Sequence, residues 1–255
     1  IFATAASTLI AITRWQLLLE AQGIQISWIK TAKLSLIGVF FNLALPGAVS
    51  GDIVKAFYIA RENPGKRGHV FGSILFDRIV GVSGLVLIAT LGLGLALGPL
   101  QGSKLIQSVW GFVLLCFLGV VFFYSLLFFV PTERDPVLRF FRASSAKFKK
   151  AGSITRIYEG VRNYHPHRKM VLKSLGLSCV IHFFAALSCL QFFYILDTGT
   201  PDLLGAFIAV PLGLLVTAVP VAPAGVGTGH AAFSWLFLLL GSTAGANIFS
   251  LSVVF

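Results

Sequence analysis

Residues 34–59 read LSLIGVFFNLALPGAVSGDIVKAFYI, an apolar run that is interrupted by Pro46-Gly47. The part before the interruption, Leu34 to Leu45, has about twelve residues and would be only ~18 Å long as a helix. The hydrocarbon core of a bilayer is ~30 Å thick, so this piece is too short to cross it. A second, apolar-leaning piece follows and ends near Ile59. The pattern therefore predicts two half-helices that meet at the break and return to the side from which they entered.

The composition places this segment in a membrane protein. Of the 255 residues, 56% are hydrophobic and only 11% are charged, whereas soluble domains have roughly 25% charged residues. This excludes an ordinary soluble enzyme, a disordered chain and a secreted disulfide scaffold. We expect an all-α, polytopic helical membrane protein. Because the sequence starts with Ile1, has its single Met at 170 and ends in apolar stretches, we interpret it as one integral membrane domain, 1–255, truncated at both ends.

The other apolar runs fit further crossings and a second interrupted segment. Crossings are expected at residues 1–19, 70–97, 105–130 and 171–196, with a last one that begins after Gly241. Residues 203–240 form the second interrupted segment, because a Pro/Gly-rich break lies at 220–229. This second segment is predicted to enter the membrane from the opposite side.

Basic residues are segregated along the chain, which indicates the topology. The net charge is +11, eleven of the twenty Lys and Arg residues lie between Arg134 and Lys173, and none follows Lys173. By the positive-inside rule, 131–169 is a cytoplasmic basic connection, and its helical stripes predict amphipathic helix on the leaflet surface. Residues 14–33 and 61–67 are also basic, so both flanks of 34–59 belong on that side. No nucleic-acid partner is expected, because no stacking platform accompanies the charge.

The two interrupted segments resemble each other in opposite orientation. Ala48-Val49-Ser50-Gly51-Asp52 aligns with Val226-Gly227-Thr228-Gly229-His230, since each run ends in a hydroxyl residue, a glycine and an ionisable residue. A span, a hairpin and a span would then occur twice, which is the inverted-topology repeat of many transporters. We expect a first repeat half at 1–130 and a second at 170–255, joined by the 131–169 connection.

The first break is a candidate site for a lipid head group. After Pro46-Gly47, a half-helix that begins near Ser50 would present free backbone N–H groups and a positive dipole end inside the membrane. Gly47 and Gly51 permit the close approach of a head group, while Ser50 either contacts the ligand or caps the helix. Burying the charged side chain of Asp52 at membrane depth costs free energy, so its presence there suggests a function. Lys55 follows Asp52 by three residues and can pair with it on one helix face.

Two further charged positions belong to the same candidate site. Asp77-Arg78 opens the apolar run at 79–97, and either residue is predicted to pair with Asp52 or Lys55 and to brace the hairpin. Direct contact of Asp77 or Arg78 with a ligand is the alternative. Arg14, at the end of the first span, is a candidate phosphate contact or a boundary residue that snorkels to the interface.

The second break supplies the opposite wall of the predicted site. Its candidate head-group residues are Gly225, Gly227, Thr228 and His230. His230 has an ordinary pKa near ~6.5 and could change charge around physiological pH, which suggests a proton-coupled role. His182 lies between Ile181 and Phe183 and is instead predicted to be a helix-packing residue.

Patterns typical of catalysis are missing from the sequence. No nucleophile–base pair, metal-ligand spacing, P-loop or dinucleotide fingerprint is present, so no enzyme activity, metal or cofactor is expected. Cys116, Cys179 and Cys189 lie in apolar runs and are interpreted as small packed hydrophobic residues.

The combined motifs resemble a known family. Arg14-Trp15, the run from Pro46 to Asp52 with Lys55, Asp77-Arg78-Ile79-Val80-Gly81 and Pro223 to His230 together resemble the flippase-like membrane domain of the lysylphosphatidylglycerol synthase/flippase family. That family includes the membrane part of the bacterial multiple peptide resistance factor and many stand-alone homologues. Two positions depart from its usual pattern: Ser50-Gly51 replaces a glycine pair, and His230 stands where a Glu is usual. The soluble aminoacyl-transfer domain is not seen, so the resemblance implies the lipid-moving half alone.

The function expected from these features is lipid translocation across the bacterial inner membrane. The two opposed hairpins would form a polar cavity that carries the head group of an anionic phospholipid or an isoprenoid phosphate, while the chains stay in lipid. One alternative is a secondary transporter of a small anionic solute, which a closed cavity without a lateral opening would favour. Another is a non-transporting module that presents a lipid to a partner synthase or glycosyltransferase. The sequence leaves the oligomeric state open.

Overall fold

The computed structural model describes residues 2–44, 50–95, 104–147, 151–195, 203–218 and 227–239. Within these ranges the chain forms α-helices, one short 3-10 turn and no strand, which confirms the all-α expectation. Among the described residues, four helices are long and apolar enough to cross a membrane, and all four coincide with predicted crossings. They are α1 (Phe2–Ala21), α4 (Arg67–Leu95), α5 (Lys104–Phe129) and α8 (Arg168–Ile195).

The shorter helices make two pairs and a connection. The first pair is α2 (Trp28–Ala44) with α3 (Ser50–Glu62), and the second is α9 (Leu203–Ala218) with α10 (Thr228–Leu239). The connection between α5 and α8 contains the 3-10 turn η1 (Thr132–Arg134), α6 (Pro136–Lys147) and α7 (Ala151–Arg162). The predicted span after Gly241 lies outside the described residues.

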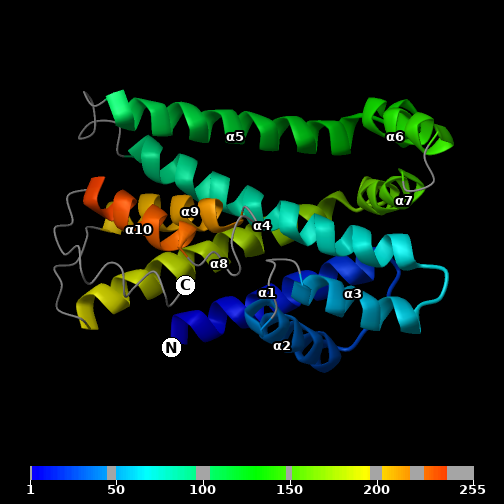
Figure 1. Cartoon of the computed structure of the whole chain (residues 1–255), viewed down its shortest axis with the longest axis horizontal. Helices are drawn as coiled ribbons and strands as arrows, with labels where there is room; N and C mark the ends of the chain where they lie inside the picture. The colour runs from blue at the N-terminus through cyan, green and yellow to red at the C-terminus, as the bar shows by residue number, and fades with distance from the viewer. Residues whose placement is uncertain are drawn as a thin grey trace.

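Each pair is an antiparallel helical hairpin in which glycine allows close contact. In the first pair, a Cβ on Gly51 would lie 1.8 Å from the carbonyl oxygen of Gly38, so the two backbones touch. In the second, a Cβ on Gly213 would lie 2.4 Å from the Phe233 ring, and one on Gly229 would lie 2.7 Å from Thr217. In the second pair, Gly213 contacts Phe233 and the later residue Thr217 contacts the earlier residue Gly229. The two helices α9 and α10 therefore run antiparallel. Figure 1 shows the two pairs toward opposite ends of the long helices.

The long helix α4 is the scaffold on which both pairs rest. α3 packs beside its first half, where Arg78 binds Asp52. α9 packs beside its second half, where a Cβ on Gly92 would meet the Phe207 carbonyl oxygen at 3.0 Å. α1 and α8 run antiparallel to each other: Thr4 lies beside Ser188, and Arg14 beside Ser178.

The α2 helix begins earlier than the sequence predicted. The first half-helix was expected to begin at Leu34, but α2 starts at Trp28 and includes Lys30 and Lys33 in a helix of 17 residues. Ser27 explains the early start, because its side-chain oxygen accepts a hydrogen bond from the Lys30 N–H, as an N-cap residue does. The Lys30 ammonium is neutralised by Glu62 at the end of α3.

The connection at 131–169 is held to the bundle through α7. α7 packs directly on α4, since a Cβ on Gly72 would lie 2.8 Å from the backbone of Gly160. Arg162, the last residue of α7, is only 2% exposed. Its guanidinium lies 3.1 Å from the Asp135 carboxylate and donates to the carbonyls of Leu126 and Val130. A buried ion pair and a capped helix end therefore fix the connection against α5.

Candidate functional site

A buried carboxylate ties the first hairpin to α4. Asp52, in the first turn of α3, is 5% exposed. Its Oδ1 lies 2.7 Å from Lys55 Nζ, and its Oδ2 accepts from Arg78 Nε at 2.6 Å. Lys55 Nζ also lies 4.7 Å from the centre of the Trp15 ring, a cation–π contact with α1. The predicted pairings of Asp52 with Lys55 and with Arg78 are thus both confirmed.

The neighbouring residue of α4 makes a second ion pair on a different side of the helix. Asp77 accepts from Arg14 Nε at 2.9 Å and from Arg14 Nη2 at 3.1 Å, which is the bidentate geometry of a strong pair. The remaining Arg14 Nη1 donates to Ser178 Oγ at 3.0 Å. Arg14 is 8% exposed, so the prediction that it snorkels to the interface is wrong. It joins α1, α4 and α8 instead.

The two ion pairs together leave an excess of positive charge. Arg14, Lys55 and Arg78 supply three cations, whereas Asp52 and Asp77 supply two carboxylates, so the cluster carries a net charge of +1. Arg78 follows Arg67, the first residue of α4, by eleven positions, or about 17 Å of helix. An anion bound beside these cations would balance the charge of the cluster.

The start of α3 differs from the predicted anion site in one respect. The Gly51 N–H, expected to be free for a ligand, donates to the side-chain oxygen of Asn42 at 2.8 Å. The Ser50 hydroxyl donates to the Phe41 carbonyl at 2.9 Å and so also ties α3 to α2. Positive charge at this site therefore comes from side chains more than from backbone N–H groups. Sequence reasoning missed Asn42, although one amide in an apolar run was a signal.

Arg78 also lines a groove that runs along the outside of α4. The groove has a volume of about 400 Å³ and an almost wholly apolar lining from α4, α5 and α9. Its wall includes Val82 and Val86 on α4, Gly119 on α5 and Leu215 on α9. The Arg78 side chain is 43% exposed, so its guanidinium is shared between Asp52 and the end of this groove. No sequence pattern predicted the groove, because it is formed between three helices.

The residues of the second break belong to the second hairpin. His230 Nδ1 accepts from the Gly227 N–H at 3.0 Å, so its ring caps the start of α10. Gly227 has φ of +84°, a conformation that favours glycine. Thr228 is the first residue of α10. Pro46, Gly47 and Gly225 lie outside the described residues.

His182 is a packing residue, as predicted. It is 9% exposed, and its Nε2 lies 3.0 Å from the Gly81 carbonyl oxygen. A Cβ on the neighbouring Gly84 would lie 3.1 Å from the ring, so α4 and α8 meet here in close contact. Of the three cysteines, Cys189 is buried in the core between α8, α9 and α10, while Cys116 lines the groove.

Comparison with known proteins agrees with this architecture. A family model described as the lysylphosphatidylglycerol synthase TM region matches residues 1–254. The chain belongs to this family. Among curated proteins, it is similar to the UPF0104 membrane protein PH1989 of Pyrococcus horikoshii, with 26% identity over 249 residues that cover 92% of this chain and 74% of the relative. No solved structure matches the chain.

Membership of the lysylphosphatidylglycerol synthase TM family confirms the resemblance drawn from the motifs. The structure explains the geometry of the Asp77-Arg78 motif, which carried part of that resemblance. Asp77 and Arg78 are consecutive, so their side chains leave α4 in different directions and bind Arg14 and Asp52 respectively. One dipeptide thereby holds α1 and α3 to the same long helix.

Proposed function

We propose that this chain is a lipid translocator that moves an anionic, phosphate-bearing lipid across the membrane. The observation that carries the proposal is the combination of a buried cluster of net positive charge with an apolar lateral groove that begins at Arg78. A lipid needs both features, because its head group is charged and its chains are apolar. The head group would balance the cluster while one chain occupies the groove.

The direction of the groove supports a path between the two hairpins. Along α4 the groove extends from Arg78 to Val86, about 12 Å of helix. It reaches Leu215 on α9, three residues before that helix ends. The groove therefore starts at the hairpin that holds Asp52 and ends beside the second hairpin, whose predicted head-group residues include Thr228 and His230.

The arrangement of helices is also compatible with an inverted repeat. α1 and α8, the first helices of the two proposed halves, pack antiparallel, as equivalent helices beside a two-fold axis in the membrane plane would. We propose that both hairpins are re-entrant and open to opposite sides. The basic connection would then lie on the cytoplasmic side of a bacterial inner membrane.

We propose transport without catalysis. The movement would run downhill or be coupled to an ion, because no energy-converting motif is present in the sequence. A lateral apolar groove favours a lipid over a small soluble anion, which would need a closed aqueous cavity. A partner synthase or glycosyltransferase remains a prediction from the sequence.

The test is leaflet exchange in liposomes that contain the purified chain and head-group-labelled phosphatidylglycerol. An impermeant quencher reports how much label has changed leaflet. Gly119 lines the groove, and a Cβ added there meets nothing within 4 Å, so Gly119→Trp fills the groove without a backbone clash. Gly111 lies on the same helix with equally open space, but outside the residues that line the groove, which makes Gly111→Trp the matched control.

We expect exchange by the unmodified chain and by Gly111→Trp, and a loss of about tenfold or more in Gly119→Trp. Asp52→Asn should also reduce exchange, because it raises the charge of the cluster and releases Arg78. Equal exchange in both tryptophan variants would refute the groove as the lipid path. Protein-dependent exchange that no head-group or groove variant changes would refute the site.

A further inference from the structure

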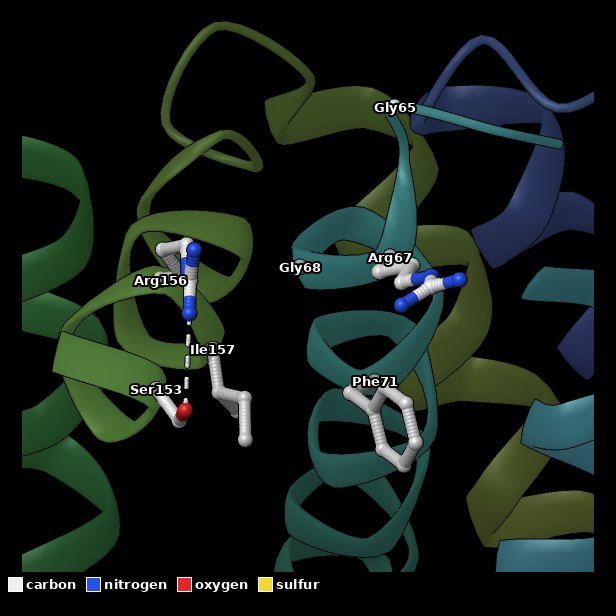
Figure 2. Close-up of a pocket in the computed structure, with 7 residues that line it drawn as sticks. All are labelled: Gly65, Arg67, Gly68, Phe71, Ser153, Arg156 and Ile157. Carbon is white, nitrogen blue, oxygen red and sulfur yellow. Dashed lines mark hydrogen bonds between the residues drawn. The ribbon is translucent and has the colours of Figure 1, made fainter. Parts of the chain in front are cut away.

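A separate, basic pocket lies at the N-terminal end of α4. It has a volume of about 520 Å³ and lies between the first turns of α4 and the helix α7. Figure 2 shows Arg67 and Phe71 on α4 and Ser153, Arg156 and Ile157 on α7, on the two walls of the pocket. None of the sequence motifs pointed to it, because its walls come from segments about 90 residues apart.

The pocket carries two positive charges without a balancing carboxylate. Arg67 and Arg156 are both exposed, and within the described ranges neither makes an ion pair. The Arg156 guanidinium makes a long contact of 3.5 Å with Ser153 Oγ. The nearest acidic residue along α7, Glu159, is already paired with Arg142. Two cations that share one cavity favour a bound anion.

The walls of the pocket are fixed in position by helix contacts. A Cβ on Gly68 would lie 2.9 Å from the carbonyl oxygen of Arg156, and one on Gly160 would lie 2.6 Å from that of Gly68. The backbones of α4 and α7 therefore touch beside the pocket, and the two arginines project from a rigid pair of helices. Arginines are well suited to phosphate, because a guanidinium presents parallel N–H donors.

Two further features match a phosphate group at a membrane surface. The pocket lies at the N-terminus of α4, where the helix dipole attracts negative charge. Phe71 lies one turn further along α4 and, with Ile157, gives the pocket apolar walls below the arginines. From this geometry we propose that the pocket binds a phosphate-bearing anion, at a site about 17 Å along α4 from Arg78 and independent of translocation.

The experiment uses the full chain in detergent micelles and compares three probes. Dissociation constants are measured for short-chain phosphatidylglycerol, short-chain phosphatidylcholine and inorganic phosphate, at one fixed low salt concentration. The pocket variant is Arg67→Gln with Arg156→Gln. The matched control is Arg134→Gln with Arg139→Gln, which removes the same charge from exposed positions on the 131–169 connection.

We expect phosphatidylglycerol to bind the unmodified chain and the control, and to bind the pocket variant at least about tenfold more weakly, since two charge-assisted contacts are lost. Saturable binding of inorganic phosphate at the same affinity would assign a soluble phosphate as the ligand, whereas binding of phosphatidylglycerol alone would assign a lipid head group. Equal weakening in both double variants, or no binding of either phosphate probe, would overturn the proposal. A failed Gly119→Trp test would leave it standing, because the groove is a separate site.

Discussion

Removing one partner of the Arg14–Asp77 pair should destabilise the fold strongly. Asp77→Asn removes the negative charge that faces the buried Arg14 guanidinium and leaves Ser178 as a neutral partner. Two charge-assisted hydrogen bonds are weakened at once. Breaking a buried ion pair by removing one partner costs about 3–5 kcal/mol, because the other charge stays buried without compensation. Because the Asp77 side chain is 20% exposed, we expect the lower end of that range, about 3 kcal/mol.

A double-mutant cycle separates the ion pair from the packing. Arg14→Met removes the cation and should also destabilise the protein by about 3 kcal/mol, since it strands the carboxylate. The double variant Arg14→Met with Asp77→Leu replaces the pair by apolar side chains of similar size. Such replacements are often close to neutral, so the double variant should lose less stability than either single one.

The free energy of unfolding can be measured for the full chain by titrating mixed micelles with a denaturing detergent and following the helical circular dichroism. A coupling energy of about 3 kcal/mol between the two positions is expected. Additive effects of the two substitutions, or an effect of Asp77→Asn below about 1 kcal/mol, would refute the conclusion that this pair holds α1 to α4.

Two more predictions follow from contacts outside that pair. Gly51→Val should separate α2 from α3, because its Cβ would lie 1.8 Å from the Gly38 carbonyl oxygen. The same denaturation experiment should show a loss of about 3 kcal/mol or more in the free energy of unfolding. An unchanged midpoint of denaturation would contradict the observed contact. Burial and the hydrogen bond to Asp135 raise the pKa of the Tyr158 phenol above its ordinary value of about 10. Since the raised pKa favours the protonated folded form, this contribution to stability is present below pH ~10 and is lost as the pH rises further. The difference in phenolate absorbance between the unmodified chain and Tyr158→Phe isolates this group, and ionisation at the ordinary tyrosine pKa would contradict the prediction.

The sequence by itself determined the features that depend on local chemistry. Apolar length located α1, α4, α5 and α8, and the Pro/Gly breaks located the two helix pairs. The pairing of Asp52 with Lys55 was predictable because residues three apart lie on one helix face. The start of α2 was misplaced, since its first turns contain two lysines and do not look apolar.

The tertiary structure decided how the helices turn their side chains toward one another. Arg14 and Asp77 are 63 residues apart, and nothing in either neighbourhood distinguishes a buried arginine from one that snorkels. Arg162 lies in a basic segment of the sequence, yet the packing of α7 buries it against Asp135. The groove needs α9 beside α4 and α5, and the basic pocket needs α7 beside α4, so both exist only once helices distant in sequence have packed together. Local pattern records which residues share a face, whereas the rotation and pairing of those faces arise from packing of the whole bundle.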